Sequence, residues 1–226
     1  MIIIEEFLNL IAPHECVGCS QLGSLLCKEC QENSIARLPS RCFLCKKVTQ
    51  DFRSCSNCYN KTKLRHVWVA SEYEEPVSLL IQKFKYQRAK EAHKILGDFL
   101  AGVLPYGISK NMLITHVPTA RRRIRERGYD QCELMARRLA QKLSRQCGNL
   151  LIRTTNTRQV GSSRHARLHQ MDNAFIVKRP SAVAGKEILI VDDVVTTGAS
   201  LVSCAKTLKA QGAKSVSAIV VAQTHE

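Results

Sequence analysis

Two adjacent aspartates and a run of small, hydroxyl-bearing residues stand together in the stretch ILIVDDVVTTGAS, residues 188–200. The carboxylates of Asp192 and Asp193 can accept hydrogen bonds from sugar hydroxyls. Backbone N–H groups at the start of a helix hold phosphate, and neighbouring hydroxyls add donors. A threonine N-cap beside two solvated aspartates is the simpler interpretation, but the apolar run directly before the acids disfavours it. The stretch predicts a ribose 5-phosphate pocket, with the phosphate held by Thr196, Thr197, Gly198, Ala199 and Ser200.

Eight of the eleven cysteines form four Cys-x-x-Cys pairs. Such a turn points two thiolates at one metal, and two turns complete a tetrahedral zinc site. The spacing C-x2-C-x7-C-x2-C recurs 26 residues later as C-x2-C-x9-C-x2-C. This repeat favours two consecutive zinc ribbons with one structural Zn²⁺ each, while an interleaved pairing of the four turns stays open. The expected ligands are Cys16, Cys19, Cys27, Cys30, Cys42, Cys45, Cys55 and Cys58.

A disulfide framework is the alternative for these cysteines, and the N-terminal stretch disfavours it, because Glu5 and Glu6 and the lack of a basic region make a poor secretory signal. About 50 residues with few apolar side chains bury too little surface to fold alone, and a structural zinc contributes on the order of 10 kcal/mol. Because protein thiolates fill every position, we expect no catalysis at zinc. The remaining cysteines are expected to be structural: Cys132, Cys147 and Cys204.

The net charge of +15 predicts anionic partners, and the positive charge is clustered. The segments TARRRIRERGYDQ (119–131) and RTTNTRQVGSSRHARLHQ (153–170) are rich in arginine, and KFKYQRAK (83–90) adds lysines beside Tyr86. Arginines can bind a pyrophosphate bidentately or follow a nucleic-acid backbone. A solvated charged face is the simpler interpretation for most individual arginines. Their number exceeds what one pyrophosphate needs, so we expect single-stranded DNA to bind Arg121, Arg122, Arg123, Arg125, Arg127, Lys83 and Lys85.

The elements that must position these groups follow from the apolar patterns. Strands are expected at 66–73, 112–118, 173–177, 187–193 and 215–223, and helices at 76–104 (one or two), 129–146 and 198–212. Strands that alternate with helices predict an α/β fold with a parallel sheet. Asp192 and Asp193 then lie at the carboxyl end of a buried strand, where such sheets bind ligands. A short amphipathic helix is expected at the N-terminus, with Ile4, Phe7, Leu8 and Ile11 on one face.

The stretch VDDVVTTGAS resembles the phosphoribosyl pyrophosphate (PRPP) motif of type I phosphoribosyltransferases. The cysteine pairs, followed by FKYQRAK, HVPTARRRIRERGYDQ, RQVGSSRHARL and NAFIV, resemble the ComF family over essentially the whole chain. That family is linked to DNA uptake in natural transformation. The resemblance implies an N-terminal helix and double zinc ribbon over residues 1–65, and a type I phosphoribosyltransferase-like parallel sheet over residues 66–226.

The resemblance also implies residue roles. Asp192 and Asp193 would bind the ribose hydroxyls and act as catalytic carboxylates, and Thr196–Ser200 would hold the 5-phosphate. Pro118 and Thr119 would lie at the pyrophosphate loop, with Mg²⁺ on the pyrophosphate. Two residues depart from the family pattern, since Gln170 stands where Asn is common and Ser162 replaces an apolar residue. Both residues lie in the arginine-rich segment 153–170 and outside the ribose phosphate site.

Two functions are therefore expected as alternatives. The first is a ComF-type protein that binds PRPP and single-stranded DNA and works with other competence proteins in DNA uptake. The second is an active phosphoribosyltransferase that transfers ribose 5-phosphate from PRPP to an unidentified acceptor, although no pocket for the acceptor and no general base stand out. No apolar run approaches the roughly 20 residues of a membrane span. We therefore expect a cytoplasmic protein, with peripheral association at the inner face of the membrane as an alternative.

Overall fold

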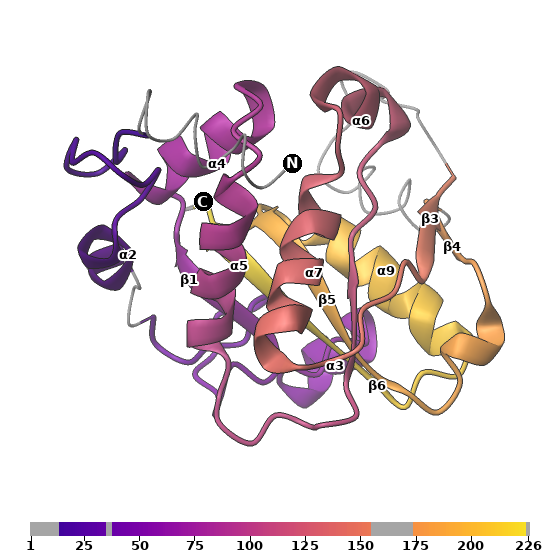
Figure 1. The fold of residues 1–226 in the computed structure, drawn as a ribbon. Coiled ribbons are helices and arrows are strands. Elements are labelled where there is room, and N and C mark those ends of the chain that lie inside the picture. Colours follow the sequence, from indigo (N-terminus) through magenta and orange to yellow (C-terminus); the bar gives the residue numbers. More distant parts are fainter. Residues whose placement is uncertain (1–13, 35–37, 155–173, 225–226) are drawn as a thin grey trace, which may run out of the picture.

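The computed structural model describes residues 14–34, 38–154 and 174–224 (Figure 1). Several sequence expectations concern other residues and lie outside these ranges. They are the N-terminal helix around Ile4–Ile11, the basic residues Arg158, Arg164 and Arg167, and the two departures at Ser162 and Gln170.

A four-stranded parallel sheet forms the centre of the molecule, as the alternating pattern predicted. Its order is β1 (Val67–Glu72), β6 (Ser215–Gln223), β5 (Glu187–Val195) and β2 (Leu113–His116). In β5, the side chains from Ile188 to Val191 are fully buried. Continuous apolar runs of this kind are typical of parallel strands that are covered on both faces.

Helices cover both faces of this sheet (Figure 1). One face packs Leu189, Val191 and Ile219 against three helices, and the other packs Ile188 and Ile190 against a single helix. The first layer is α4 (Val77–Tyr86), α5 (Ala92–Val103) and α7 (Gln131–Leu143), and the second is α9 (Ala199–Ala210). The stretch 76–104 therefore forms two helices, whose buried side chains include Leu80, Phe84, Leu96 and Phe99 as expected.

A separate two-stranded antiparallel sheet differs from the expected alternation. β3 (Leu151–Arg153) pairs with β4 (Phe175–Val177), and neither strand joins the central sheet. The strand at 173–177 was expected, but β3 was not, because its two apolar residues lead directly into Arg153 and a polar run. The 3-10 helix η1 (Pro180–Ala182) leads from β4 towards β5, and α6 (Arg121–Arg127) follows β2.

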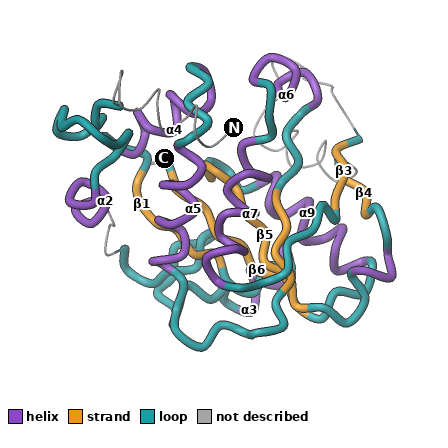
Figure 2. Tube along the Cα trace, viewed as in Figure 1, coloured by secondary structure: helices purple, strands orange, loops and turns teal. Residues whose placement is uncertain are grey.

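The paired cysteines gather into two groups of four, and their pairing is consecutive rather than interleaved. The first group is Cys16, Cys19, Cys27 and Cys30, and the second is Cys42, Cys45, Cys55 and Cys58. Loops carry most of this region, with α2 (Lys28–Ser34) and α3 (Ser56–Thr62) as its described helices (Figure 2).

The cysteine region shares its hydrophobic core with the central sheet. Leu25 and Leu26 pack in one cluster with Trp68 of β1, and Leu64 packs in the cluster on the opposite face. The Arg65 N–H donates to the Val216 carbonyl oxygen over 2.7 Å, next to the start of β6. The two parts are thus joined by packing and hydrogen bonds. Among the described residues, no helix is both long and apolar enough to span a membrane.

Candidate functional site

Asp192 and Asp193 lie near the carboxyl end of β5, as the sequence predicted. The Asp193 N–H donates to Asp192 Oδ1 over 2.9 Å, and the Val194 N–H donates to Asp193 Oδ1 over 2.6 Å. Asp193 is only 7% exposed, and Asp192 is half-buried. The backbone of the strand therefore fixes both carboxylates at the edge where open α/β sheets bind their ligands.

Two side chains from other helices hold the Asp193 carboxylate. Lys85 Nζ of α4 lies 2.9 Å from Asp193 Oδ2, and Gln131 Nε2 of α7 donates to the same oxygen over 3.1 Å. Burial lowers the pKa of Lys85, but the Asp193 charge outweighs it and the net shift is upward. Lys85 therefore stays protonated and compensates the negative charge of the buried carboxylate.

The second carboxylate has a different environment. Burial, and then repulsion from Asp193, raise the pKa of Asp192 to about 7. The Cys132 thiol donates to Asp192 Oδ1 over 3.3 Å, and burial and the two aspartates raise the pKa of this thiol well above its usual value. Cys132 is consequently a protonated hydrogen-bond donor at the site, and not the purely structural residue that the sequence led us to expect.

The expected phosphate-binding turn leads from β5 into α9. Gly198 is the residue before the helix and has a φ of +72°, a conformation that glycine adopts readily. The Ala199 N–H donates weakly to Thr197 Oγ1 over 3.4 Å, and the Val202 N–H donates to the Gly198 carbonyl over 2.9 Å. Because α9 has 12 residues, its first N–H groups present a full helix dipole at this turn.

The second cysteine group reaches this turn through Phe43, which lies between Cys42 and Cys45. A methyl carbon added at Gly198 would stand 2.5 Å from Phe43 Cε2, closer than real side chains approach. The aromatic ring therefore covers Gly198 directly. Gly198 is required here for its positive φ and for the space that Phe43 takes.

The loop after β2 lies beside the aspartates because β2 and β5 are neighbours. The Val117 N–H donates to the Val191 carbonyl over 3.0 Å, which places Pro118 and Thr119 next to the end of β5. Asp130 accepts from the Thr119 N–H and from Thr119 Oγ1, each over 2.9 Å. Asp130 was not among the expected site residues, and the only signal for it was an acidic residue directly before a helical pattern.

Asp130 also organises the start of α7. It accepts from the N–H groups of Cys132 and Glu133 over 3.0 and 3.3 Å, as an N-cap does. His116 Nε2 lies 3.7 Å from Asp130 Oδ2, and burial lowers the pKa of His116 despite this negative charge. One carboxylate thus ties the loop after β2 to the helix that carries Gln131 and Cys132.

The basic residues expected to bind nucleic acid lie in four different environments. Arg127 is 8% exposed, and its guanidinium lies 5.5 Å from the centre of the Tyr86 ring. Lys85 is engaged with Asp193, so we no longer count it in an exposed basic surface. Lys83 is half-buried. The exposed basic side chains of α6 are Arg121, Arg122, Arg123 and Arg125.

Arg153 connects the small sheet to the site. Its Nη1 donates to the Pro118 carbonyl over 3.5 Å, and its guanidinium lies over the Phe175 ring. Burial, and the nearby positive charge of Arg123, lower the pKa of Arg153, while Asp192 acts in the opposite direction. Two arginines and an aspartate therefore interact electrostatically across the site.

The two cysteine groups have the geometry of metal sites. The sulfur atoms of Cys19 and Cys27, and those of Cys45 and Cys55, are 3.7 Å apart. Four thiolates at about 2.3 Å from a tetrahedral Zn²⁺ are separated by about 3.8 Å. The Cys27 N–H also donates to Cys16 Sγ over 3.3 Å, which favours a thiolate. The donor set and the spacing therefore fit zinc. Cys204 of α9, by contrast, is fully buried in the core, as expected of a structural residue.

Comparisons with known proteins agree with this arrangement. The phosphoribosyl transferase domain family matches residues 130–226, which include both aspartates, the turn and α9. The DNA utilization protein YhgH of Escherichia coli O157:H7 is 31% identical over 178 residues, which are 75% of this chain and 77% of that protein. The protein of the same name from Salmonella typhimurium is 32% identical over 172 residues, which are 72% of this chain and 74% of that protein.

Two solved structures show the extent of the structural likeness. A glutamine PRPP amidotransferase from B. subtilis aligns with 57% of this chain and 25% of its own, with 20% identity and a TM-score of 0.40. A hypoxanthine phosphoribosyl transferase from Trypanosoma cruzi aligns with 60% of this chain and 65% of its own, with 14% identity and a TM-score of 0.32.

Proposed function

Because this chain belongs to the ComF family, we propose that it binds PRPP and single-stranded DNA and acts in the cytoplasm in DNA uptake. Its relatives are named DNA utilization proteins, and the matched phosphoribosyl transferase domain contains both aspartates, the turn and α9. One observation carries the PRPP part of the proposal. Two carboxylates at the end of β5 stand directly before a glycine turn and the N-terminus of α9.

In this proposal the two sides of the turn bind the two ends of one ligand. The ribose hydroxyls donate to the carboxylates of Asp192 and Asp193. The 5-phosphate accepts from N–H groups at the start of α9 and from the hydroxyls of Thr196, Thr197 and Ser200. Gln131 Oε1 supports the assignment, because it is buried and has no hydrogen-bond partner among the described residues. A ribose hydroxyl would satisfy it.

The pyrophosphate end would lie near the loop after β2. Arg123 and Arg153 interact electrostatically with each other, and Arg153 also interacts with Asp192. Their guanidinium groups can bind pyrophosphate oxygens bidentately.

The pyrophosphate would bring Mg²⁺ with it. Mg²⁺ prefers oxygen ligands, but the carboxylates here already accept from the Lys85 ammonium and the Cys132 thiol, and in this proposal their remaining lone pairs accept from the ribose hydroxyls. We therefore propose that Mg²⁺ is held mainly by the ligand's own oxygens. When bound, it supplies charge neutralisation on the pyrophosphate.

The PRPP proposal is tested by isothermal titration with PRPP and Mg²⁺. Replacing Asp192→Ala together with Asp193→Ala should abolish binding, because both ribose acceptors are lost. A matched control is Asp98→Ala, which removes an acid that pairs with Arg138 and lies outside the site. Unchanged affinity in the double variant would show that the ribose assignment is wrong.

For the cysteine groups we propose one structural Zn²⁺ each. All ligands come from the protein, so these ions would fold the cysteine region and take no part in catalysis. Metal analysis of the purified protein should find two Zn²⁺ per chain, one for each group of four cysteines.

For single-stranded DNA we propose that α6 provides the main contact. Arg121 and Arg125 are exposed, whereas Arg122 is paired with Glu126 over 2.7 Å and Arg123 is assigned above to the pyrophosphate. Arg121→Ala with Arg125→Ala should weaken binding in a gel shift and make its salt dependence shallower, by about 0.7 in slope for each lost phosphate contact. Lys28→Ala with Lys61→Ala removes the same charge elsewhere and should have little effect. Equal effects of the two pairs would count against α6.

The second candidate is an active phosphoribosyltransferase. An acceptor would attack ribose C1, the bond from C1 to the pyrophosphate oxygen would break, and pyrophosphate would leave with its electron pair. The carboxylates of Asp192 and Asp193 would stabilise the positive charge that develops on the ribose. Their placement beside Arg153 favours this candidate, and pyrophosphate release measured with bases, amines and DNA as acceptors tests it.

A further inference from the structure

A cavity with cationic side chains in its wall lies at the opposite end of the central sheet from the aspartates. It has a volume of about 640 Å³ and lies between the second cysteine group and the start of β6. Its walls include Arg53, Ser54 and Tyr59 from the cysteine region, and Arg65 and Lys214 from the segments that precede β1 and β6. We refer to it as the second anion pocket.

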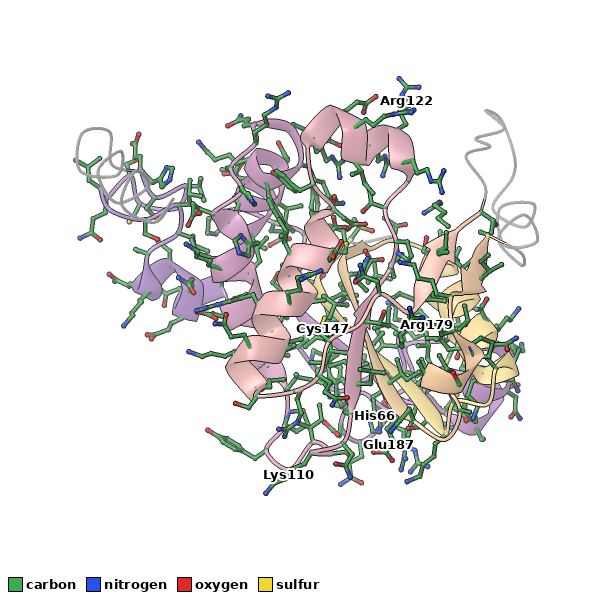
Figure 3. The ribbon with its side chains drawn as sticks, turned by 45° about the vertical axis from the view of Figure 1, so that its right-hand side comes forward. His66, Lys110, Arg122, Cys147, Arg179 and Glu187 are labelled. Carbon is green, nitrogen blue, oxygen red and sulfur yellow. The ribbon has the colours of Figure 1, made fainter. Side chains whose placement is uncertain are left out.

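This pocket is separate from the candidate ribose phosphate site. β5 begins at Glu187 and reaches Asp192 five residues later, a span of about 17 Å at roughly 3.3 Å per residue. Figure 3 shows Glu187 and His66 at one end of the molecule and Arg122 at the other. A ligand in this pocket would not compete directly with PRPP.

Two buried hydroxyl groups in its wall have no hydrogen-bond partner within the described ranges. Ser54 is 5% exposed, and its Oγ makes no hydrogen bond to any described residue. The buried Oγ1 of Thr49, which also lines the pocket, is in the same state. An unsatisfied buried hydroxyl lowers stability, so two beside one cavity indicate groups that a ligand completes.

The charge of the pocket is positive. Three of its lining residues are cationic, and none is acidic. Lys214 pairs with Glu187 over 3.1 Å, but Arg53 and Arg65 form no salt bridge in the part of the chain that the structure describes. Both arginine side chains are exposed, and Arg65 also lies within electrostatic reach of Glu187.

We propose that the second anion pocket binds the phosphate of a nucleotide, supplied either free or as one unit of a single strand. Arginine forks and hydroxyls bind phosphate oxygens, and Tyr59 offers an aromatic face to a base beside them. The volume lies within the range of small-molecule sites. This site is independent of the PRPP proposal, because it shares no residue with it.

The test uses the full chain with Asp192→Ala and Asp193→Ala, so that the ribose phosphate site does not contribute. Thymidine 5′-phosphate and a short oligothymidine are titrated separately by calorimetry. Adding Arg53→Ala and Arg65→Ala should weaken binding of at least one probe by about tenfold or more, because two charged phosphate contacts are lost. The control pair Lys61→Ala and Lys110→Ala removes the same charge from exposed side chains that do not line the pocket.

The two probes identify the source of the phosphate. Loss of mononucleotide binding supports a free nucleotide, and loss of oligothymidine binding alone supports a strand. If neither probe binds, or if both pairs of substitutions weaken binding equally, the proposal is overturned. PRPP binding to the unsubstituted chain is measured separately, so failure of one proposal leaves the other intact.

Ser54→Ala distinguishes a ligand-binding hydroxyl from a structural one, because the two roles predict different changes in melting temperature and nucleotide affinity. Removing an unsatisfied hydroxyl should leave the melting temperature unchanged or raise it, while nucleotide affinity falls. A lower melting temperature with unchanged affinity would show that the Ser54 hydroxyl serves the fold and not a ligand.

Discussion

The Asp192 carboxyl group titrates near neutral pH in the folded chain. Its pKa is raised to about 7, because burial disfavours the charged form and Asp193 repels it. In the unfolded chain the pKa of an aspartate is about 3.9, so the folded state binds more protons between these values. The stability that protonation provides is complete below the unfolded pKa and is lost as pH rises through about 7.

This titration leads to a prediction for Asp192→Asn. The asparagine can keep its carbonyl oxygen towards Asp193 N–H and the Cys132 thiol while removing the charge. Thermal unfolding at pH 8 should therefore show a melting temperature several degrees higher than that of the unsubstituted chain, and near pH 4 the difference should largely disappear. A lower melting temperature at pH 8 would contradict the unfavourable burial of this charge.

Lys85 compensates the charge of Asp193, so removing the Lys85 ammonium should lower the stability of the folded chain. Lys85→Met leaves a buried carboxylate without its cation, which costs about 3 kcal/mol of unfolding free energy. Lys83→Met on the same helix is the control and should cost much less. Denaturant unfolding measures both, and equal losses would show that the ion pair contributes little.

The sequence revealed one part of this site and not the other. Asp192, Asp193 and Thr196–Ser200 are consecutive, so a local pattern was enough to identify them. Lys85, Gln131 and Cys132 come from α4 and α7 and reach the carboxylates only through tertiary packing. Lys85 stands among other cations in the sequence, which gave no sign that it is buried against an acid.

At the level of elements, the turn before α9 depends on the cysteine region. Phe43 occupies the space above Gly198, and α3 of the second cysteine group contacts α9. The spacing of the cysteines could not show this contact, and it left their pairing open as well. The parallel sheet, in contrast, followed from long apolar runs, while β3 was not recognised because it ends in Arg153 and a polar run follows it.

Phe43→Ala should therefore weaken PRPP binding, although Phe43 itself would not contact the ligand. The turn loses the ring that covers Gly198, so its N–H groups are less well ordered for a phosphate. We expect an affinity lower by about fivefold to tenfold, roughly 1–1.4 kcal/mol, in a calorimetric titration. Leu44→Ala, at the neighbouring exposed position, is the control. Equal affinities for the two variants would contradict a link between this cysteine group and the phosphate turn.

At the level of the whole molecule, we propose that residues 1–65 and 66–226 are distinct modules that unfold together. Leu25, Leu26 and Leu64 from the cysteine region are buried in the cores on the two faces of the sheet. Loss of order around the cysteines would consequently expose apolar surface of the sheet and its helices.

Zinc removal tests whether the two modules unfold together. Because a structural zinc contributes on the order of 10 kcal/mol, chelation should lower the melting temperature by about 10 °C or more. Differential scanning calorimetry should show one transition before and after chelation. Two separate transitions, with the one at higher temperature unaffected by the chelator, would show that the modules are energetically independent.

The central claim is that the turn between β5 and α9 holds the ribose and the 5-phosphate of PRPP. Amide NMR of the zinc-loaded chain, titrated with PRPP and Mg²⁺, tests it most directly because it locates the ligand. We predict the largest shifts at the backbone N–H groups of residues 192–193 and 196–200, and little change at residues 53–56 and 65. Saturating PRPP that leaves residues 196–200 unshifted would contradict the account.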